Sequence, residues 1–133
     1  KFICDPVAAS AAELAAQLGA TVSTPEAVLA DSSIDAVVIA SPTDTHSDLI
    51  HRAAKAGKHI FCEKPVDLSV PRAQACAETV KAAGVACMIG FQRRFDPTFS
   101  ALTARLAAGE IGTPEVLVVT SRDPGAPPIA PEY

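Results

Sequence analysis

The stretch AVVIASPTDT, residues 36–45, decides the fold. Its first five residues are continuously apolar and mostly β-branched, which predicts a strand buried on both faces, as in a parallel sheet. A polar loop follows, and then a helical pattern of apolar residues that ends at Gly57. A buried strand, a polar loop and an amphipathic helix in this order make up half of a β-α-β unit.

The same order recurs on both sides of this stretch. The other expected strands are residues 2–4, 21–23, 59–62, 86–90 and 116–119. The other expected helices begin at capping residues or prolines and several stop at a glycine, with starts at Pro6, Pro25, Ser69 and Asp96 and stops at Gly19, Gly84 and Gly109. Asp5 can cap the first of these helices, and Ser23 and Glu26 have the spacing of a capping box for the second. Repeated β-α alternation implies right-handed crossovers and a doubly wound parallel sheet covered on both faces, an α/β fold.

Composition excludes several classes of protein. The chain has 133 residues, 49% of them apolar, and a net charge of −4. That apolar fraction is too high for a disordered chain, and no apolar run is long enough to span a membrane. A net acidic chain without a basic run argues against a dedicated nucleic-acid binder. The four cysteines lack zinc-ligand spacing and no metal cluster is apparent, so we expect reduced thiols in a cytoplasmic protein.

Polar side chains follow the predicted strands, where ligands bind in an open parallel sheet. The residues concerned are Asp5, the loop 41–46, Glu63, Lys64, Pro65, Gln92, Arg93 and Arg94. Because the carboxyl ends of parallel strands meet at one rim, this set predicts a common crevice. No Ser-His-acid set is apparent among them.

Asp5 stands between a strand and a helix, and two interpretations of it stay open. A carboxylate there can accept hydrogen bonds from both ribose hydroxyls of an adenosine, or it can only cap the helix. If it binds ribose, its charge repels a 2′-phosphate and no arginine follows to receive one. The first interpretation therefore favours NAD over NADP.

The basic residues also have two interpretations each. Lys64, at a strand end, can hydrogen-bond a substrate hydroxyl and move a proton, or it can be an ordinary solvated lysine. Pro65 can fix that loop through a cis bond. Arg93 and Arg94 are expected to point to opposite sides, one of them into a cleft or both into structural ion pairs. His46, at a helix start, can contact a cofactor, cap the helix or lie on the surface.

Two blocks, AGKHIFCEKP (residues 56–65) and MIGFQRRFDP (residues 88–97), resemble the glucose-fructose oxidoreductase / inositol dehydrogenase (Gfo/Idh/MocA) family. The spacing between the blocks, the SPTDTH loop and the strand-end Asp5 fit the same family. The segment TSRDPGAPP, residues 120–128, is most similar to its inositol 2-dehydrogenase branch. The resemblance runs along essentially the whole chain.

The resemblance implies an NAD-binding Rossmann domain, residues 1–112, followed by the beginning of an α/β substrate and oligomerisation domain, residues 113–133. It implies that Lys64 is catalytic and contacts the substrate hydroxyl. The cofactor residues that it implies are Asp5, Ser41, Pro42, Thr43, His46, Glu63 and Gln92. It places Arg93 near the nicotinamide and the polyol, and Asp123 at the substrate. It also implies a homotetramer.

Two departures from the family pattern limit what these residues do alone. The family's first strand with its G-x-G-x-x-G loop, and its later catalytic Asp and His, have no counterpart between Lys1 and Tyr133. The first strand is expected to lie centrally, between the strands at residues 2–4 and 36–40. We therefore expect an incomplete sheet, poor NAD binding and no turnover from the 133 residues by themselves.

The leading interpretation is a fragment of an NAD-dependent oxidoreductase that oxidises a secondary hydroxyl of a cyclic polyol, with myo-inositol oxidised to 2-keto-inositol. Three alternatives stay open. The first is a dehydrogenase of the same family for another sugar or polyol. The second is an NAD-binding sensor or scaffold domain without chemistry. The third is a methyltransferase, because an acid after the second strand also suits the ribose of S-adenosylmethionine, although that function leaves Glu63, Lys64 and Pro65 without a role.

Overall fold

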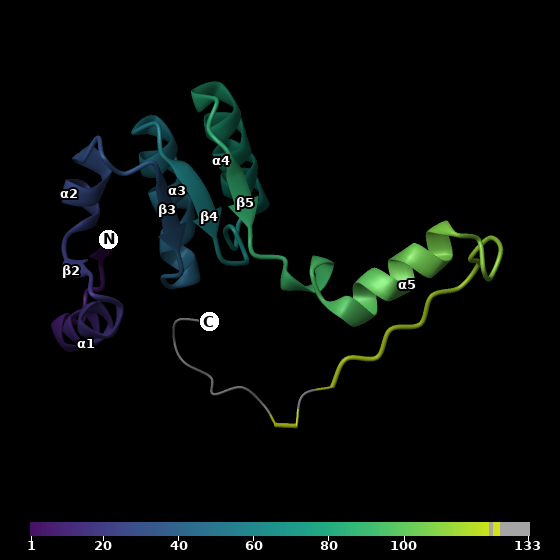
Figure 1. Cartoon of the computed structure of the whole chain (residues 1–133). Helices are drawn as coiled ribbons and strands as arrows, with labels where there is room; N and C mark the ends of the chain where they lie inside the picture. The colour runs from purple at the N-terminus through teal and green to yellow at the C-terminus, as the bar shows by residue number, and fades with distance from the viewer. Residues whose placement is uncertain (123, 126–133) are drawn as a thin grey trace. The chain divides into compact units, whose positions relative to one another are not determined.

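The computed structural model describes residues 1–122 and 124–125. It divides into two compact units, Lys1–Gly90 and a second unit that begins at Phe91. Figure 1 shows the helices and strands of both units. Asp123, which the sequence places at the substrate, lies outside the described residues.

All strand pairing in the first unit is parallel. One sheet pairs β1 (Phe2–Ile3) with β2 (Thr21–Val22), and the other has the order β3 (Ala36–Ile39), β4 (His59–Cys62), β5 (Cys87–Ile89). No ladder joins the two sheets among the described residues. This is the order of a doubly wound sheet without its central strand, so the predicted α/β topology is confirmed.

The helices of the first unit are α1 (Ala8–Leu18), α2 (Pro25–Ala30), α3 (Thr43–Lys55) and α4 (Val70–Ala83). α1 and α4 end where the sequence predicts, because Gly19 and Gly84 adopt the left-handed conformation that closes a helix. The predicted capping box of α2 is wrong by one residue. The Oγ1 of Thr24, not the side chain of Ser23, accepts the bond from the Ala27 N–H.

The core of the first unit lies on one face of the β3-β4-β5 sheet. α3 and α4 pack together against that face (Figure 1), and they bury Ile39, Ile60 and Cys62 between them and the strands. The expected burial of residues 36–40 on both faces is wrong. Val38 points to the other face and is 74% exposed, because no described helix covers β3 there.

A buried lysine joins the loop after α2 to the start of β4. Lys58 is 6% exposed, and its Nζ donates to the carbonyl oxygens of Asp31 (2.7 Å) and Ile34 (2.8 Å). Carbonyl acceptors compensate part of the cost of burying the ammonium group. These hydrogen bonds anchor the segment that leads into β3. They lie at the end of the sheet opposite to the polar loops.

The second unit contains a 3-10 helix, η1 (Gln92–Arg94), and the helix α5 (Pro97–Ala107). The Asp96 side chain caps α5 by accepting from the N–H groups of Thr98 (2.9 Å) and Phe99 (3.1 Å), as the sequence predicts. The predicted strand at residues 116–119 is wrong, since these residues are extended, exposed and unpaired within the described chain. A segment whose sequence favours a strand forms one only where a neighbouring strand provides backbone hydrogen bonds.

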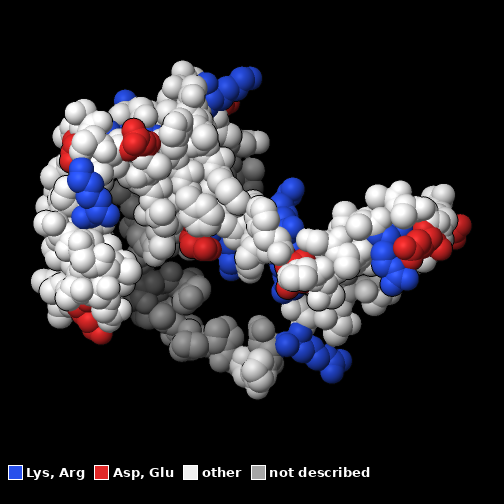
Figure 2. All heavy atoms as spheres, viewed as in Figure 1, with Lys and Arg blue, Asp and Glu red and all other residues white. Residues whose placement is uncertain are grey.

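Acidic and basic side chains are interspersed on the face drawn in Figure 2. No helix in the described part of the chain is long and apolar enough to cross a membrane.

Candidate functional site

Glu63, Lys64 and Pro65 form a turn at the carboxyl end of β4. Glu63 extends the ladder, because its N–H donates to the carbonyl oxygen of Ile39 (2.9 Å). The Lys64–Pro65 peptide bond is cis, which confirms the sequence-based expectation. Lys64 is exposed, and its Nζ has no hydrogen-bond or ion-pair partner among residues 1–122 and 124–125. Its ammonium group is therefore free to meet a substrate.

His46 lies beneath this turn in the first turn of α3. It is 1% exposed, with Nδ1 2.7 Å from the Pro65 carbonyl oxygen and Nε2 2.7 Å from the Ser41 carbonyl oxygen. Both ring nitrogens therefore face the main chain of this protein. His46 links the loop after β3 to the loop after β4, a role that the sequence analysis did not anticipate.

The loop after β3 runs directly into α3. The hydroxyls of Ser41 and Thr45 lie 2.5 Å apart, and Thr45 Oγ1 donates to the carbonyl oxygen of Pro42 (2.7 Å). Thr43, expected in a loop, is the first residue of the helix. A helix N-terminus presents unpaired N–H groups and a partial positive charge, which attract an anionic ligand to this end of the strand.

Asp5 follows β1 and is exposed. Its Oδ1 accepts a hydrogen bond from the Val7 N–H at 2.7 Å. The expected helix cap at Asp5 is wrong in detail, because α1 begins at Ala8 and its capping position is Val7. The second carboxylate oxygen, Oδ2, has no partner in the described part of the chain, so it is available to a ligand hydroxyl.

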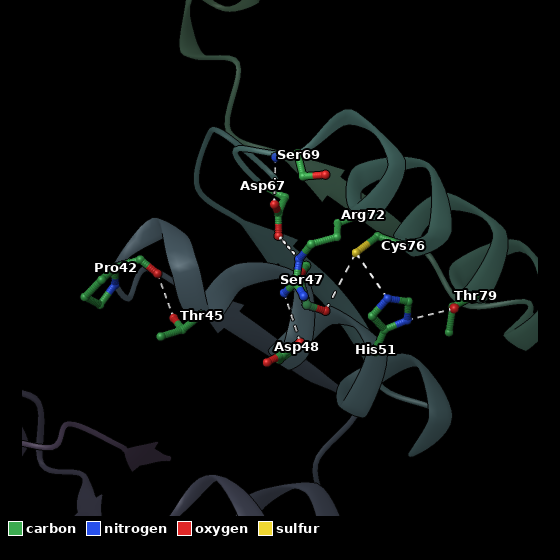
Figure 3. A network of polar contacts seen from close by, with 10 residues as sticks. All are labelled: Pro42, Thr45, Ser47, Asp48, His51, Asp67, Ser69, Arg72, Cys76 and Thr79. Atoms are coloured by element: carbon green, nitrogen blue, oxygen red, sulfur yellow. Dashed lines mark hydrogen bonds and ion pairs between the residues drawn. The ribbon is translucent and has the colours of Figure 1, made fainter. Parts of the chain in front are cut away.

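A polar network ties α3 to α4 behind these loops (Figure 3). Arg72 donates from Nε to Asp67 Oδ2 (2.8 Å) and from Nη2 to Ser47 Oγ (2.5 Å) and Asp48 Oδ1 (3.2 Å). The Asp67 Oδ1 atom accepts from the Ser69 N–H (2.8 Å). The hydrogen bond from Arg72 is the main reason that the pKa of Asp67 is lowered to about 2. Hydrogen bonds from the Ser47 side chain and the Ser69 N–H lower it further. The network holds in place the segment that follows Pro65.

The cysteines of the first unit are not suited to nucleophilic chemistry. Burial is the main reason that the pKa of the Cys62 thiol is raised to about 12. The nearby Cys87, Cys76 and Glu63 raise it further by smaller amounts. Burial also raises the pKa of Cys76, whose Sγ lies 3.6 Å from His51 Nε2. Thiols that stay protonated are poor nucleophiles. These buried thiols are therefore not candidate nucleophiles for this region.

Two of the predicted site residues belong to the second unit. Gln92 and Arg93 lie in η1, and both are exposed. The guanidinium carbon of Arg93 is 5.2 Å from the centre of the Phe99 ring, a cation–π contact within the unit. Neither Arg93 nor Arg94 forms an ion pair within the described residues, so the alternative of structural ion pairing is not what the structure shows.

A parallel sheet with a polar loop and a helix N-terminus at the carboxyl ends of its strands has the architecture of a nucleotide-binding domain. Residues 1–91 match the family described as "Oxidoreductase family, NAD-binding Rossmann fold" (GFO_IDH_MocA). The chain belongs to this NAD-binding Gfo/Idh/MocA family.

Individual relatives agree with the family. The chain is 49% identical over 127 residues to an inositol 2-dehydrogenase of Rhizobium meliloti, covering 96% of this chain and 38% of that protein. It is 46% identical to a scyllo-inositol 2-dehydrogenase (NAD(+)) of Bacillus subtilis, covering 96% and 39%. A scyllo-inositol dehydrogenase from Lactobacillus casei, solved with NAD(H) and scyllo-inositol, superimposes with a TM-score of 0.79 at 28% identity, covering 84% and 34%. The chain thus spans about two fifths of the length of the curated relatives named here.

The residues present fit part of a dinucleotide. The free Oδ2 of Asp5 suits a ribose hydroxyl, and the N-terminus of α3 with the Ser41 loop suits the anionic centre of the molecule. The seven glycines of the chain contain no G-x-G-x-x-G set for close approach to the pyrophosphate. The fit therefore covers a ribose hydroxyl and an anionic group, but it lacks the glycines for close approach to the pyrophosphate.

Proposed function

We propose that the protein is an NAD-dependent dehydrogenase that oxidises a secondary hydroxyl of a cyclic polyol, with myo-inositol as substrate and 2-keto-inositol as product. The observation that carries the proposal is the free ammonium group of Lys64 at the carboxyl end of β4, in a chain 49% identical to an inositol 2-dehydrogenase.

The cofactor residues divide by position. Asp5 would accept from the adenosine ribose, and Ser41, Pro42 and Thr43 would hold the dinucleotide at the start of α3. The family resemblance assigns Glu63 to the nicotinamide ribose and Gln92 to the nicotinamide. His46 supports the site from below, because both of its ring nitrogens already face carbonyl oxygens. When bound, NAD supplies a hydride acceptor at the nicotinamide C4 atom.

Lys64 binds and orients the substrate. Its Nζ donates a hydrogen bond to the reacting hydroxyl oxygen and stabilises the negative charge that develops there as the hydroxyl proton leaves. The hydroxyl proton goes to a base outside these residues. Arg93 and Asp123 supply further donors and acceptors for the other hydroxyls of the ring, since a polyol needs many polar partners.

The intact protein that carries this chain tests the proposal. NADH formation is measured with myo-inositol, scyllo-inositol and glucose, and with NADP in place of NAD. We expect turnover with an inositol and NAD, and little with glucose or NADP. Equal rates with glucose would support another sugar dehydrogenase of the family. NAD binding without turnover of any polyol would support the sensor function.

The proposal also covers the cellular compartment, the domain organisation and the assembly of the protein. The four free cysteines of the structure suit a reducing compartment, and we place the protein in the cytoplasm. We assign residues 1–112 to the cofactor domain and residues 113–133 to the beginning of a substrate domain through which a homotetramer assembles. The exposed apolar residues at 116–119 support this, because such a segment pairs with a strand that the described residues do not provide.

A further inference from the structure

Gly90 lies where a Cβ atom would crowd the side chain of Glu63. It follows β5 directly, is buried, and its N–H donates to the carbonyl oxygen of Cys62 (2.8 Å). A Cβ atom built on Gly90 would lie 3.0 Å from Oε1, 3.1 Å from Cδ and 3.2 Å from Oε2 of Glu63. The Glu63 carboxylate therefore lies directly over the missing side chain.

Backbone conformation does not require this glycine. Five glycines of the chain have a positive φ, and Gly90 is not among them. An alanine can adopt the backbone of Gly90, so the reason for glycine here is space. The signal in the sequence is a glycine placed one residue after a strand, at the same rim as Glu63 on the neighbouring strand.

A methyl group at residue 90 would displace the carboxylate and leave the sheet in place. The backbones on both sides are fixed by the ladder, since Cys62 pairs with Ile89 and the Glu63 N–H is bonded to Ile39. Glu63 is exposed at the end of a flexible side chain, and the one hydrogen bond to its carboxylate in the described chain comes from the Lys64 N–H at 3.2 Å. The carboxylate is thus the part that yields most easily.

We propose that Gly90 is a positioning residue for the reaction: its missing side chain sets the place of the Glu63 carboxylate beside Lys64 and the nicotinamide ribose. The expected effect on cofactor binding rests on the proposed function. The expected displacement of the Glu63 carboxylate rests on the contact geometry. A carboxylate that has room beside Gly90 can accept ribose hydroxyls without the displacement that a methyl group would impose.

The test compares Gly90→Ala with the wild-type intact protein, alone and combined with Glu63→Ala. We expect the crystal structure of G90A to show the Glu63 carboxylate moved and the ladder unchanged. The Kd for NAD is expected to rise about fivefold to tenfold, as for loss of one charge-assisted hydrogen bond. In the Glu63→Ala background, Gly90→Ala is expected to change the Kd less than twofold, because no carboxylate remains to displace.

Gly57→Ala is the matched control. Gly57 has φ +72° and nothing within 4 Å of its Cβ position, so alanine there strains the backbone without touching a neighbour. It is expected to lower Tm and leave the Kd for NAD unchanged, the reverse of Gly90→Ala. An unmoved carboxylate in G90A, or an equal loss of NAD affinity with and without Glu63, would overturn the inference. Failure of the intact protein to oxidise any polyol would overturn the proposed function. The crystal structure of G90A would then still decide whether Gly90 sets the position of the Glu63 carboxylate.

Discussion

The imidazole of His46 holds the main chain of Pro65, with Nδ1 2.7 Å from its carbonyl oxygen. Through Nε2 the same ring reaches the Ser41 carbonyl oxygen, so one buried side chain sets the distance between the two loops of the site. Substitution should therefore affect both stability and ligand binding.

We expect His46→Ala to lower the free energy of unfolding by about 2–4 kcal/mol, because it removes the imidazole that joins the Ser41 and Pro65 carbonyl oxygens and opens a cavity. Urea denaturation measures the loss. His46→Gln, which keeps a donor for one carbonyl, should recover part of it, and an alanine variant as stable as the wild type would contradict the contact. His51→Ala is the comparison for a histidine that bonds a hydroxyl, Thr79 Oγ1, instead of two carbonyls.

Lys64→Ala in the intact protein should lower kcat by about 10²–10⁴, the range for loss of a positioned proton-transfer or hydrogen-bonding group. The Kd for NAD should change little, because the ammonium group is directed to the substrate. Steady-state kinetics and NAD titration separate these effects. Lys55→Ala, at the exposed end of α3, serves as a control that removes the same charge. Unchanged kcat in the Lys64 variant would contradict the catalytic role.

Asp5→Ser should weaken NAD binding about tenfold, as expected for loss of a hydrogen bond to a charged group. It should also reduce the preference for NAD over NADP, because the charge that repels a 2′-phosphate is gone. Binding constants for both cofactors provide the measurement. A variant with the wild-type preference would show that Asp5 only fixes the turn before α1 through Val7.

The Asp67–Arg72 pair predicts a specific acid sensitivity. The ordinary pKa of an aspartate is about 4, and that of Asp67 in the folded chain is about 2. A lowered pKa stabilises the fold above pH 4, and this contribution disappears as pH falls from about 4 to 2. Asp67→Asn should flatten the pH dependence of Tm in that window. Asp35→Asn, at an exposed carboxylate, provides the control, and an unchanged profile in the Asp67 variant would contradict the pair.

Lys58 offers a test of the fold away from the site. Lys58→Met keeps the length of the side chain and removes the donor to the carbonyl oxygens of Asp31 and Ile34. We expect a loss of about 1–3 kcal/mol of unfolding free energy, because both carbonyls lose their partner. Lys55→Met, on the neighbouring exposed turn, should cost a few tenths of a kcal/mol. Equal effects of the two variants in urea denaturation would argue against the buried contact.

Local features of the fold could be predicted from the sequence, and features that depend on distant partners could not. Gly19 and Gly84 end their helices as predicted, since a left-handed cap is decided within one turn. The burial of Val38 and the strand at residues 116–119 were predicted wrongly, because both depend on segments that pack from elsewhere. Residue type alone does not say whether such a segment is present.

For the site, the sequence located the loops but not the contacts between them. It identified Lys64 at a strand end, where the structure leaves its ammonium group free. It left His46 open between a cofactor contact, a helix cap and the surface, whereas the structure turns both ring nitrogens toward carbonyl oxygens. It gave Gly90 no role, because the closeness of Gly90 to Glu63 arises only when β4 and β5 pair.

Parallel pairing governs the order in which this chain acquires its structure. Phe2 pairs with Thr21, Ala36 with His59 and Ile60 with Cys87, so a whole helix separates the two members of every ladder. The described residues provide no hairpin as a fast nucleus, and each pairing must first close a loop of helix length. Refolding should accordingly be slower than that of a helical bundle of equal size, with the β3–α3–β4–α4 segment gaining hydrogen-exchange protection first.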